Sequence, residues 1–580
     1  MKKTVCLIGR PNVGKSTIFN KLIRENKSII MDTPGVTRDR IYGTVNYDDY
    51  SFLLIDTGGI DYGKEDFNKD VRLQAEIAIE ESDVILFIVD GREDLTSNDL
   101  AIRDMLMKTD KKVIVVLNKL DNPKMQEERI YYYYELGFEY VYPVSALHNL
   151  GCKVNSYETE AMEQMLINDG YEIVPFSDAA DVYVINTCSV TNMADHKSRQ
   201  MIHKAKKQNP DAIIVAAGCY VQTATIAGKT PQDFNCDIII GNNQKHNLIS
   251  EIHKFEASKK TESFIIDIND GVAEYEEFSP FVPKEHTRAF IKIQDGCNQF
   301  CSYCIIPYAR GRARSRKLES ILSEVKSWVE KGYKEIVLTG IHITSYGITG
   351  EVELIDVIEA IDAIPGVERI RLSSLEPQVC TEEFCRRIAK VKKICPHFHL
   401  SLQSGCNATL KRMNRKYNAD EYKEGCRRLR KVFDHPAITT DVIVGFPQET
   451  EEEFAESKAF CKDIHFYEMH VFKYSKRHGT RAEKMPGQIP EKEKALRSDA
   501  LLTLEEEMSK EYRSYFVGKE VSVLFEEEIS VDGKRYMTGF TKEYIKVAYP
   551  IKDSGEKLAN EIRNGRITGF LKNDLMLFEI

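Results

Sequence analysis

The ten residues ALHNLGCKVN, at positions 146–155, constrain the fold of this chain more than any other stretch, because two sequence patterns meet in them. Before them, apolar strands alternate with helical segments around glycine-bearing loops; after them, cysteines follow apolar strands. Each pattern needs a strand that ends at this point. One strand cannot pair centrally in two separate sheets. The chain must therefore contain at least two folded units that compete for one segment.

The length and composition predict a globular protein of several domains. A chain of 580 residues is too long for one hydrophobic core, and three or four domains are expected. Its apolar runs, such as VILFIV at 84–89, suit buried strands and are too short to cross a bilayer. MKKTVCLIGR is typical of a first strand rather than a signal peptide, so we expect a cytoplasmic protein with reduced thiols and no membrane partner. The net charge of −10 argues mildly against a nucleic-acid partner, although local patches can outweigh it.

The segment KTVCLIGRPNVGKSTIFNKL has the spacing of a phosphate-binding loop between a strand and a helix. Its glycines let backbone N–H groups close around phosphates at a helix N-terminus. Lys15 can reach the terminal phosphates, and the Ser16 hydroxyl can bind Mg²⁺. The alternative is a chance glycine-rich turn. The predicted phosphate-loop residues are Gly9, Pro11, Asn12, Val13, Gly14, Lys15, Ser16 and Thr17.

Three further motifs favour a guanine nucleotide. SFLLIDTGG ends a strand with an aspartate that can meet Mg²⁺ through water, and VIVVLNKLD ends another with an aspartate that can accept from guanine N–H donors. VYPVSAL follows a last strand, where a backbone N–H can meet the guanine O6. Residues 1–150 are therefore predicted to form a doubly wound parallel sheet that binds GTP and Mg²⁺. The residues concerned are Asp56, Gly59, Asn118, Lys119, Asp121, Ser145 and Ala146.

GRPNVGKST, MDTPGVTRDRIYG, DTGGI and NKLD together resemble the first G domain of the Der (EngA) ribosome-assembly GTPases. The resemblance covers residues 1–150 and implies that Thr37 senses the γ-phosphate and Mg²⁺. It also implies that any association with ribosomes runs through this half. The family continues with a closing helix, a second G domain and a KH-like domain, whereas this chain continues with another pattern.

Cys297, Cys301 and Cys304 form a C-x3-C-x2-C motif in IKIQDGCNQFCSYCIIPYARGRARSR. Three thiolates at this spacing can hold three corners of a 4Fe–4S cluster and leave the fourth iron open to a ligand. A structural zinc site is the alternative, but zinc normally takes four protein ligands.

The same motif resembles the radical SAM superfamily, whose open iron binds S-adenosylmethionine (SAM). The resemblance makes these three cysteines the radical-generating centre. The segments YKEIVLTGIHI, IRLSSLEP, HFHLSLQSG and TTDVIVGFP are spaced as strands of a partial parallel (βα) barrel. By resemblance, the SAM pocket would be lined by Gly340, Ser401, Gln403 and Gly445. For each of these residues taken alone, a purely structural role at the end of a barrel strand is as good an interpretation as contact with SAM.

A second trio of cysteines precedes the first. Cys152, Cys188 and Cys219 each come just after an apolar strand, and the carboxyl ends of parallel strands meet at one edge of a sheet. The trio is therefore predicted to hold a second metal cluster. The alternative is three unrelated buried cysteines.

GCKVNSYETEAM, VINTCSVT, AAGCY, GNNQK, the 297–304 motif and LSLQSG together resemble the radical SAM tRNA methylthiotransferases, in the wording of the MtaB type. The family has two 4Fe–4S clusters, the auxiliary one handling sulfur. Its chemistry implies that a 5′-deoxyadenosyl radical removes hydrogen from C2 of N6-threonylcarbamoyladenosine at position 37 of the tRNA anticodon loop. A sulfur methylated by a second SAM is then transferred, and an electron donor is required. A sister branch acts on isopentenyl-adenosine instead.

The resemblance sets the expected domains after the GTPase. They are an α/β N-terminal methylthiotransferase domain (151–283), the radical SAM domain (284–517) and a small β-barrel (518–580) that resembles the TRAM RNA-binding module. The tail's Lys534, Lys542, Lys546, Arg535, Tyr536 and Tyr544 are candidate RNA contacts. The arginines in RGRARSRK at 310–317 either grip phosphates or pair with acids inside the barrel.

The junction is predicted to belong to the methylthiotransferase, because the helix after it matches that family. The GTPase sheet would then lack its last strand and helix and would bind GTP poorly, and a junction that suits both patterns suggests a gene fusion. Three function classes remain: a tRNA-modifying radical enzyme, a ribosome-assembly GTPase, and a noncatalytic RNA-binding scaffold. The six cysteines favour the first.

Overall fold

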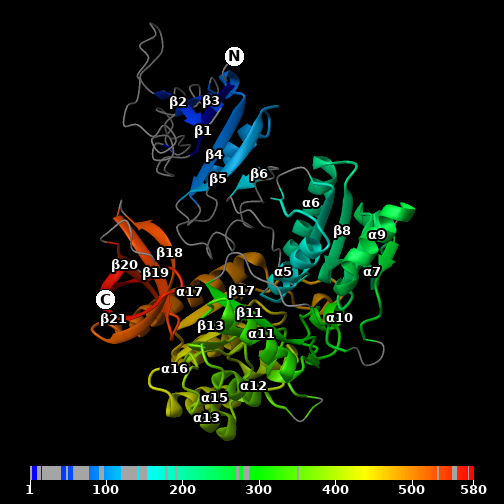
Figure 1. The fold of residues 1–580 in the computed structure, drawn as a ribbon. Helices are drawn as coiled ribbons and strands as arrows, with labels where there is room; N and C mark the ends of the chain where they lie inside the picture. Colours follow the sequence, from blue (N-terminus) through cyan, green and yellow to red (C-terminus); the bar gives the residue numbers. More distant parts are fainter. Residues whose placement is uncertain are drawn as a thin grey trace. The chain divides into compact units, whose positions relative to one another are not determined.

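The chain divides into two compact units, Met1–Ala146 and Leu147–Ile580 (Figure 1). Among the residues that the structure describes, no helix has both the length and the apolar character needed to cross a bilayer. The computed structural model describes residues 3–9, 15, 41–47, 50–56, 78–90, 97–118, 140–142, 153–174, 176, 180–189, 192–226, 228–260, 262–269, 274–278, 287–348, 350, 352–531, 534–551, 558–572 and 574–580.

The first unit is built on a six-stranded sheet in the order β2-β3-β1-β4-β5-β6. The sheet is parallel except where β2 pairs antiparallel with β3. Its core side chains, among them Cys6, Ile85 and Phe87, are fully buried. The predicted parallel α/β sheet is confirmed. Its elements are β1 (Lys3–Ile8), β2 (Ile41–Tyr47), β3 (Tyr50–Asp56), β4 (Val84–Asp90), α3 (Ser97–Leu106), β5 (Lys112–Asn118) and β6 (Tyr140–Tyr142).

The strand before the junction corrects one prediction. β6 pairs with β5 in parallel register, Val115 opposite Val141, so this strand belongs to the GTPase sheet and not to the methylthiotransferase. The prediction was wrong because it followed the family match of the helix and ignored the open edge of β5. An unpaired strand edge is satisfied by the next suitable segment of the same unit. The helix after the junction, α5 (Lys153–Asn168), does lie in the second unit, as predicted. The junction is therefore divided between the two units.

The second unit begins with a four-stranded parallel sheet in the order β10-β9-β8-β7. Its strands are short, and β8 and β9 are apolar; the β8 side chains are all buried, as expected for a strand covered on both faces. The elements are α5, β7 (Val182–Thr187), α6 (Asn192–Gln208), β8 (Ile213–Gly218), α7 (Cys219–Ile226), α8 (Pro231–Phe234), β9 (Ile238–Ile240), η2 (Lys245–Asn247), α9 (Leu248–Ser258) and β10 (Glu262–Phe264).

A partial (βα) barrel follows. Its strands form two sheets, β12-β11-β13-β14 and β15-β16-β17, which isolated bridges such as Leu375–Leu400 connect. Every other strand residue packs against the surrounding helices, which form the largest core of the molecule. The barrel strands are β11 (Arg288–Asp295), β12 (Arg314–Ser315), β13 (Glu335–Gly340), β14 (Arg369–Leu372), β15 (His397–His399), β16 (Ala437–Val444) and β17 (Glu468–Lys473).

Some helices of this barrel begin at residues whose side chains cap the first turn. Asn418 accepts from the Glu421 N–H at the start of α15, and Thr450 accepts from the Glu453 N–H at the start of α16. The helices are α10 (Ile306–Arg310), α11 (Leu318–Glu330), α12 (Leu354–Asp362), α13 (Glu382–Ile388), α14 (Asn407–Arg412), α15 (Ala419–Val432), α16 (Glu451–Ile464) and α17 (Glu491–Ser514), with short 3₁₀ turns η3 (Ile343–Ser345), η4 (Pro377–Val379) and η5 (Ala482–Lys484).

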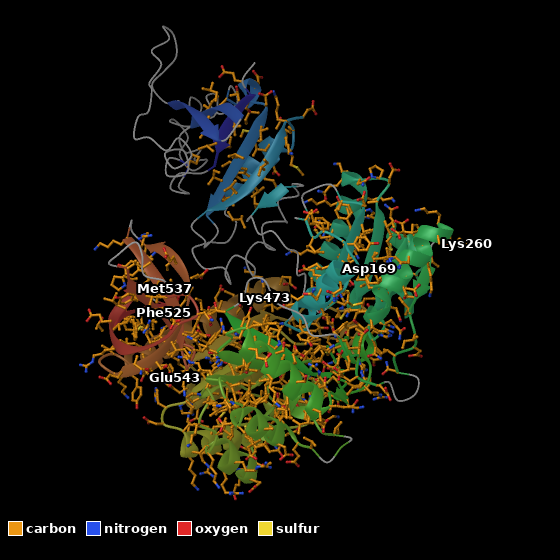
Figure 2. All side chains as sticks on the ribbon, viewed as in Figure 1. Asp169, Lys260, Lys473, Phe525, Met537 and Glu543 are labelled. Carbon is orange, nitrogen blue, oxygen red and sulfur yellow. The ribbon has the colours of Figure 1, made fainter. Side chains whose placement is uncertain are left out.

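The tail forms a closed five-stranded barrel in the order β18-β19-β20-β22-β21, which confirms the predicted β-rich C-terminal region. Phe525 and Met537 lie in its core (Figure 2). Tyr544 is half-buried, and its ring stacks on His397 and Phe540. Its role as an RNA contact stays a prediction. The strands are β18 (Glu520–Val531), β19 (Lys534–Thr541), β20 (Lys546–Pro550), β21 (Ile562–Lys572) and β22 (Leu575–Glu579).

Candidate iron–sulfur and nucleotide sites

The described part of the nucleotide site lies at the carboxyl edge of the first sheet. Gly9 follows β1, while Asp56 and Asn118 are the last residues of β3 and β5. The Lys15 side chain is buried and its Nζ donates to the Gly9 carbonyl at 3.0 Å. These positions agree with a phosphate loop at the strand ends. The other predicted residues lie outside the described ones: Pro11, Asn12, Val13, Gly14, Ser16, Thr17, Thr37, Gly59, Lys119, Asp121, Ser145 and Ala146.

In the second unit, the C-x3-C-x2-C motif occupies the loop that follows β11. Phe300, between the first two cysteines, has a left-handed backbone (φ 51°), which turns the loop tightly. Cys301 is buried, and Cys297 and Cys304 are half-buried. Burial raises the pKa of the Cys297 and Cys304 thiols to about 12, so metal binding must displace their protons.

An arginine from another part of the barrel reaches this loop. Arg415 donates from Nη1 to Cys301 Sγ at 3.2 Å and from Nη2 to Glu376 at 2.7 Å. Glu376 also accepts from Gln299 in the cysteine loop and lies 3.2 Å from His342 Nε2. Arg415 thus places a positive charge beside one of the three cysteine sulfurs. The donor set and its surroundings therefore fit a thiolate-held iron–sulfur cluster.

The predicted SAM-pocket residues all lie at or just beyond strand ends of this barrel. Gly340 is the last residue of β13, Ser401 and Gln403 follow β15, and Gly445 follows β16. Gly445 has φ +70°, and a Cβ there would come within 2.3 Å of the Lys494 side chain, so packing alone already requires glycine. Their role in holding SAM stays a prediction.

Two of the three auxiliary cysteines are adjacent in space. Thr187 at the end of β7 pairs with Gly218 at the end of β8. Cys188 and Cys219 immediately follow these two strand ends. Both cysteines are buried, and Asn242 donates to Cys219 Sγ at 3.3 Å. The two thiols thus share one edge of the sheet, as the spacing predicts.

Cys152 lies outside the described residues, but the helix that directly follows it is bound to the same sheet edge. In the first turn of α5, the Asn155 side chain donates to the Thr187 carbonyl at 3.2 Å. The Asn186 side chain donates back to the Asn155 carbonyl at 3.0 Å. The start of α5 is therefore held beside Cys188, which supports the predicted trio.

A fully buried ionic network connects this sheet to the radical SAM barrel. Glu158 of α5 lies 2.5 Å from Lys245, 2.7 Å from Lys292 and 2.7 Å from Arg310. Asn242 connects the same network to the auxiliary side: its Oδ1 accepts from Lys245 Nζ at 2.8 Å, and its amide donates to Cys219 Sγ and to the Ala309 carbonyl. The network thus fixes the auxiliary cysteines relative to the 297–304 loop.

The arginines at 310–317 do not form an open phosphate-binding run. Arg310, Arg314 and Arg316 are buried and face carboxylates of Asp295, Glu158 and Glu324. Of the two interpretations, internal pairing is confirmed for these three. The reason is position: alternate residues of β12 and the adjoining loop face the charged inside of the molecule.

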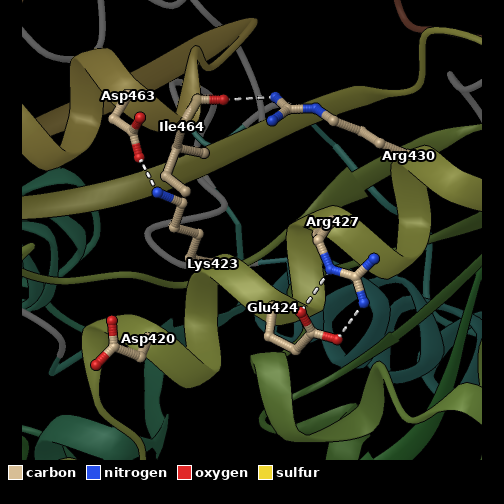
Figure 3. Close-up of a pocket in the computed structure, with 7 residues that line it drawn as sticks. All are labelled: Asp420, Lys423, Glu424, Arg427, Arg430, Asp463 and Ile464. Atoms are coloured by element: carbon tan, nitrogen blue, oxygen red, sulfur yellow. Dashed lines mark hydrogen bonds and ion pairs between the residues drawn. The ribbon is translucent and has the colours of Figure 1, made fainter.

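A surface pocket between α15 and α16 is not part of either site. Its charged side chains pair with one another or with backbone: Lys423 lies 2.6 Å from Asp463, Arg427 lies 2.6 Å from Glu424, and Arg430 donates to the Ile464 carbonyl (Figure 3). Asp420 completes the rim (Figure 3). The pocket lies on the outer, helical side of the barrel.

Sequence reasoning missed several polar residues that surround the sites. None belongs to a cysteine motif. Most lie on barrel strands or in the loops that follow them, but Asn242 is part of GNNQK and Arg415 follows the helix Asn407–Arg412. They are His342, Glu376, Arg415, Asn242, His399, Asp441 and His470.

Comparison with known families agrees with this division of the chain. Residues 4–119 match a family described as 50S ribosome-binding GTPase, and residues 291–461 match the radical SAM superfamily. Residues 145–241 match a family described as Uncharacterized protein family UPF0004. Fold and site together define a radical SAM enzyme preceded by a GTPase domain.

Curated relatives narrow the class further. The threonylcarbamoyladenosine tRNA methylthiotransferase MtaB of Bacillus subtilis is 41% identical over 411 residues, which cover 70% of this chain and 90% of that protein. MtaB of Aquifex aeolicus is 40% identical over 66% of this chain and 93% of its own length. The tRNA-2-methylthio-N(6)-dimethylallyladenosine synthase of Clostridium novyi is 34% identical over 72% and 89%. The chain belongs to the radical SAM tRNA methylthiotransferase family.

Proposed function

We propose that this chain converts N6-threonylcarbamoyladenosine at position 37 of tRNA to its 2-methylthio derivative. The identity to the two MtaB proteins, 41% and 40%, exceeds the 34% to the dimethylallyladenosine enzyme and favours the threonylcarbamoyl substrate. The substrate would be the anticodon loop of tRNA, and an external electron donor is needed.

Two 4Fe–4S clusters would divide the work. Cys297, Cys301 and Cys304 would hold one with an open iron for SAM, and Cys188 and Cys219, together with Cys152, would hold the auxiliary one. When bound, the clusters supply the electron that cleaves SAM and the site at which sulfur is handled. The chain's own residues keep the two cysteine sets in fixed relation and exclude water from both. The single observation that carries this proposal is the buried bridge from Cys219 through Asn242 to the Ala309 carbonyl.

The proposal is tested by mass spectrometry of tRNA nucleosides from a deletion strain complemented with this gene. We expect 2-methylthio-threonylcarbamoyladenosine to reappear with the wild type and not with Cys301→Ala. Methylthiolation of dimethylallyladenosine alone would contradict the substrate assignment. Iron and sulfide analysis of the reconstituted protein tests the second cluster, because Cys219→Ala should lose about half of the eight irons that two 4Fe–4S clusters contain.

A second function is favoured by one observation in the first unit. β6 supplies the last strand, whose expected loss was one of the two grounds for weak nucleotide binding, while the helix after the junction lies in the second unit. We infer that this unit binds guanine nucleotides. Titration of the full chain with labelled GDP should show saturable binding that excess GDP, but not ADP, displaces, and Lys15→Ala should abolish it. Equal displacement by ADP would contradict guanine selection.

A further inference from the structure

Three polar side chains gather on the side of the radical SAM barrel that faces away from its helices. On β15, β16 and β17, the residues Phe398, Val442 and Met469 pack into the helix-covered core. Strand side chains alternate between faces, so their neighbours His399, Asp441 and His470 point to the opposite, concave side. The register agrees, since Asp441 and His470 are direct partners in the parallel pairing of β16 with β17.

The three side chains form one compact polar cluster. Each of the three residues has one side-chain nitrogen or oxygen that lies within 4.8 Å of such an atom in both of the others. His399 Nε2 lies 3.3 Å from Asp441 Oδ2, and His399 Nδ1 lies 3.0 Å from the Thr439 hydroxyl. The His399 and His470 rings stack with centroids 5.7 Å apart. The His399 and Asp441 side chains keep 12% and 28% of their surface exposed, so a ligand can reach them.

The cluster lies within electrostatic reach of the residues around the radical-generating loop. The backbone N–H of Gln403, a candidate SAM-pocket residue, donates to the Asp441 carbonyl at 2.8 Å. Burial by itself raises the pKa of Asp441, but His399, His470 and Arg415 outweigh burial and hold the pKa below its ordinary value. Arg415 is the residue that donates to Cys301 Sγ. Asp441 is therefore an ionised acceptor beside two imidazoles.

An aromatic side chain continues the same face. Phe472 lies two residues after His470 on β17 and keeps 47% of its surface exposed. Exposed aromatic rings in RNA-binding proteins serve as platforms for unstacked bases. A base stacked there would have its exocyclic substituent next to the His–Asp–His cluster.

We propose that His399, Asp441 and His470 bind the polar N6 substituent of the target adenosine. The inference rests on the proposed function. A threonylcarbamoyl group offers a carboxylate, a hydroxyl and urea-type N–H groups, which match two imidazole donors and one carboxylate acceptor. An apolar dimethylallyl group could make none of these hydrogen bonds and would displace water from the partly exposed cluster without replacing it. The cluster thus selects for a polar substituent.

The test compares the reconstituted full chain with His470→Ala on two tRNAs, one bearing threonylcarbamoyladenosine and one bearing dimethylallyladenosine at position 37. Taking the ratio of kcat/KM for the two tRNAs cancels general losses of activity. We expect the ratio to fall about 100-fold or more, largely through KM for the threonylcarbamoyl tRNA. His253→Ala, an exposed histidine on α9, is the matched control and should leave the ratio unchanged.

Three results would overturn the inference. One is a kcat/KM ratio that is unchanged in both His470→Ala and His399→Gln. The His399→Gln variant is included because its milder change guards against a folding defect. Another is a stoichiometric divalent metal in the wild type that is lost in both variants, since two histidines and an aspartate can also hold such an ion. The third is a wild type that modifies neither tRNA although it cleaves SAM, and this result would overturn the proposed function as well.

Discussion

Two buried ionic networks join the radical SAM barrel to its neighbours in the second unit, the N-terminal sheet and the C-terminal barrel. The two networks contact different parts of these neighbours. The network around Glu158 pairs side chain with side chain across the interface with the N-terminal sheet. The network around Glu335 uses arginines that donate to backbone carbonyls of the C-terminal barrel. The first interface rests on side chains from both sides, and the second combines donation to tail carbonyls with side-chain contacts such as the Arg288–Glu526 pair at 2.8 Å.

The first network is dense in charge. Burial alone would raise the pKa of Glu158, but Arg310, Lys245 and Lys292 hold it well below its ordinary range. Asp295 adds a second buried carboxylate, 2.7 Å from Lys292. Such a group of charges is tolerable only while every member is paired.

The second network is smaller. Arg371 lies 2.6 Å from Glu335 and donates to the Lys542 carbonyl at 3.0 Å, and Arg369 donates to the Phe540 carbonyl at 2.9 Å. Burial opposes ionisation of Glu335, yet the arginines, Arg371 foremost, lower its pKa to about 2. Peptide carbonyls are present whatever the tail sequence, so this part of the docking tolerates change in the tail's side chains, whereas the Arg288–Glu526 pair does not.

The largest effect is expected from Glu158→Ala. It leaves Lys245, Lys292 and Arg310 buried with one carboxylate fewer, which costs about 3–5 kcal/mol. The free energy of unfolding in urea and methylthiolation of tRNA should both fall sharply. Glu163→Ala, a half-buried acid on the same helix, is the control. A loss below about 1 kcal/mol, the range of an exposed pair, would show that the network does not hold the interface.

Arg371→Gln should have a smaller effect, about 2–4 kcal/mol. Glu335 would keep Arg369 at 3.5 Å, while the Lys542 carbonyl would lose its donor. Hydrogen exchange should accelerate in β18 and β19 before it does in β13, because the barrel undocks first. Arg386→Gln, on the exposed face of α13, is the control and should change neither the free energy of unfolding nor the hydrogen-exchange rates. Uniform acceleration across the unit would contradict separate docking.

Lys542→Ala tests the backbone side of the comparison. The Lys542 side chain donates to the Lys392 carbonyl at 3.5 Å on the surface, and the substitution removes this contact. The backbone carbonyl of residue 542, which accepts from Arg371, is still present in the variant. We expect the free energy of unfolding to change by no more than about 0.5 kcal/mol. A loss comparable to that of Arg371→Gln would mean that side-chain identity matters here too.

The smallest effect concerns pH. Unlike Glu158 and Glu335, Glu505 on α17 has a raised pKa of about 7, because burial and the charge of Glu468 disfavour its ionised form. Folding therefore favours the protonated acid, and its contribution to stability is lost as pH rises from about 4.5 through 7. Glu505→Gln should raise the Tm by a few degrees at pH 8 and hardly at pH 5. Glu506→Gln serves as the control, and an equal gain at both pH values would contradict the shift.

Prediction from sequence reaches furthest where chemistry is local. Cys297, Cys301 and Cys304 share one loop, and Gly9 and Lys15 share another, so their spacing alone indicates a cluster and a phosphate site. It was less complete where residues meet across strands. His399, Asp441 and His470 come from three strands and belong to no motif. Only the register of β15, β16 and β17 shows that they face one another.

The sequence by itself indicated the two chemistries, the GTPase motifs before the radical SAM motifs, and the conflict of two patterns over residues 146–155, because motif spacing and strand patterns are properties of short segments. Tertiary structure decided where one unit ends and the next begins: β6 pairs with β5 in the first unit, while α5 packs in the second. It also decided that Arg310, Arg314 and Arg316 are buried partners rather than RNA contacts. Both outcomes depend on which edges and charges are left unsatisfied once distant segments have met, and no local pattern records that.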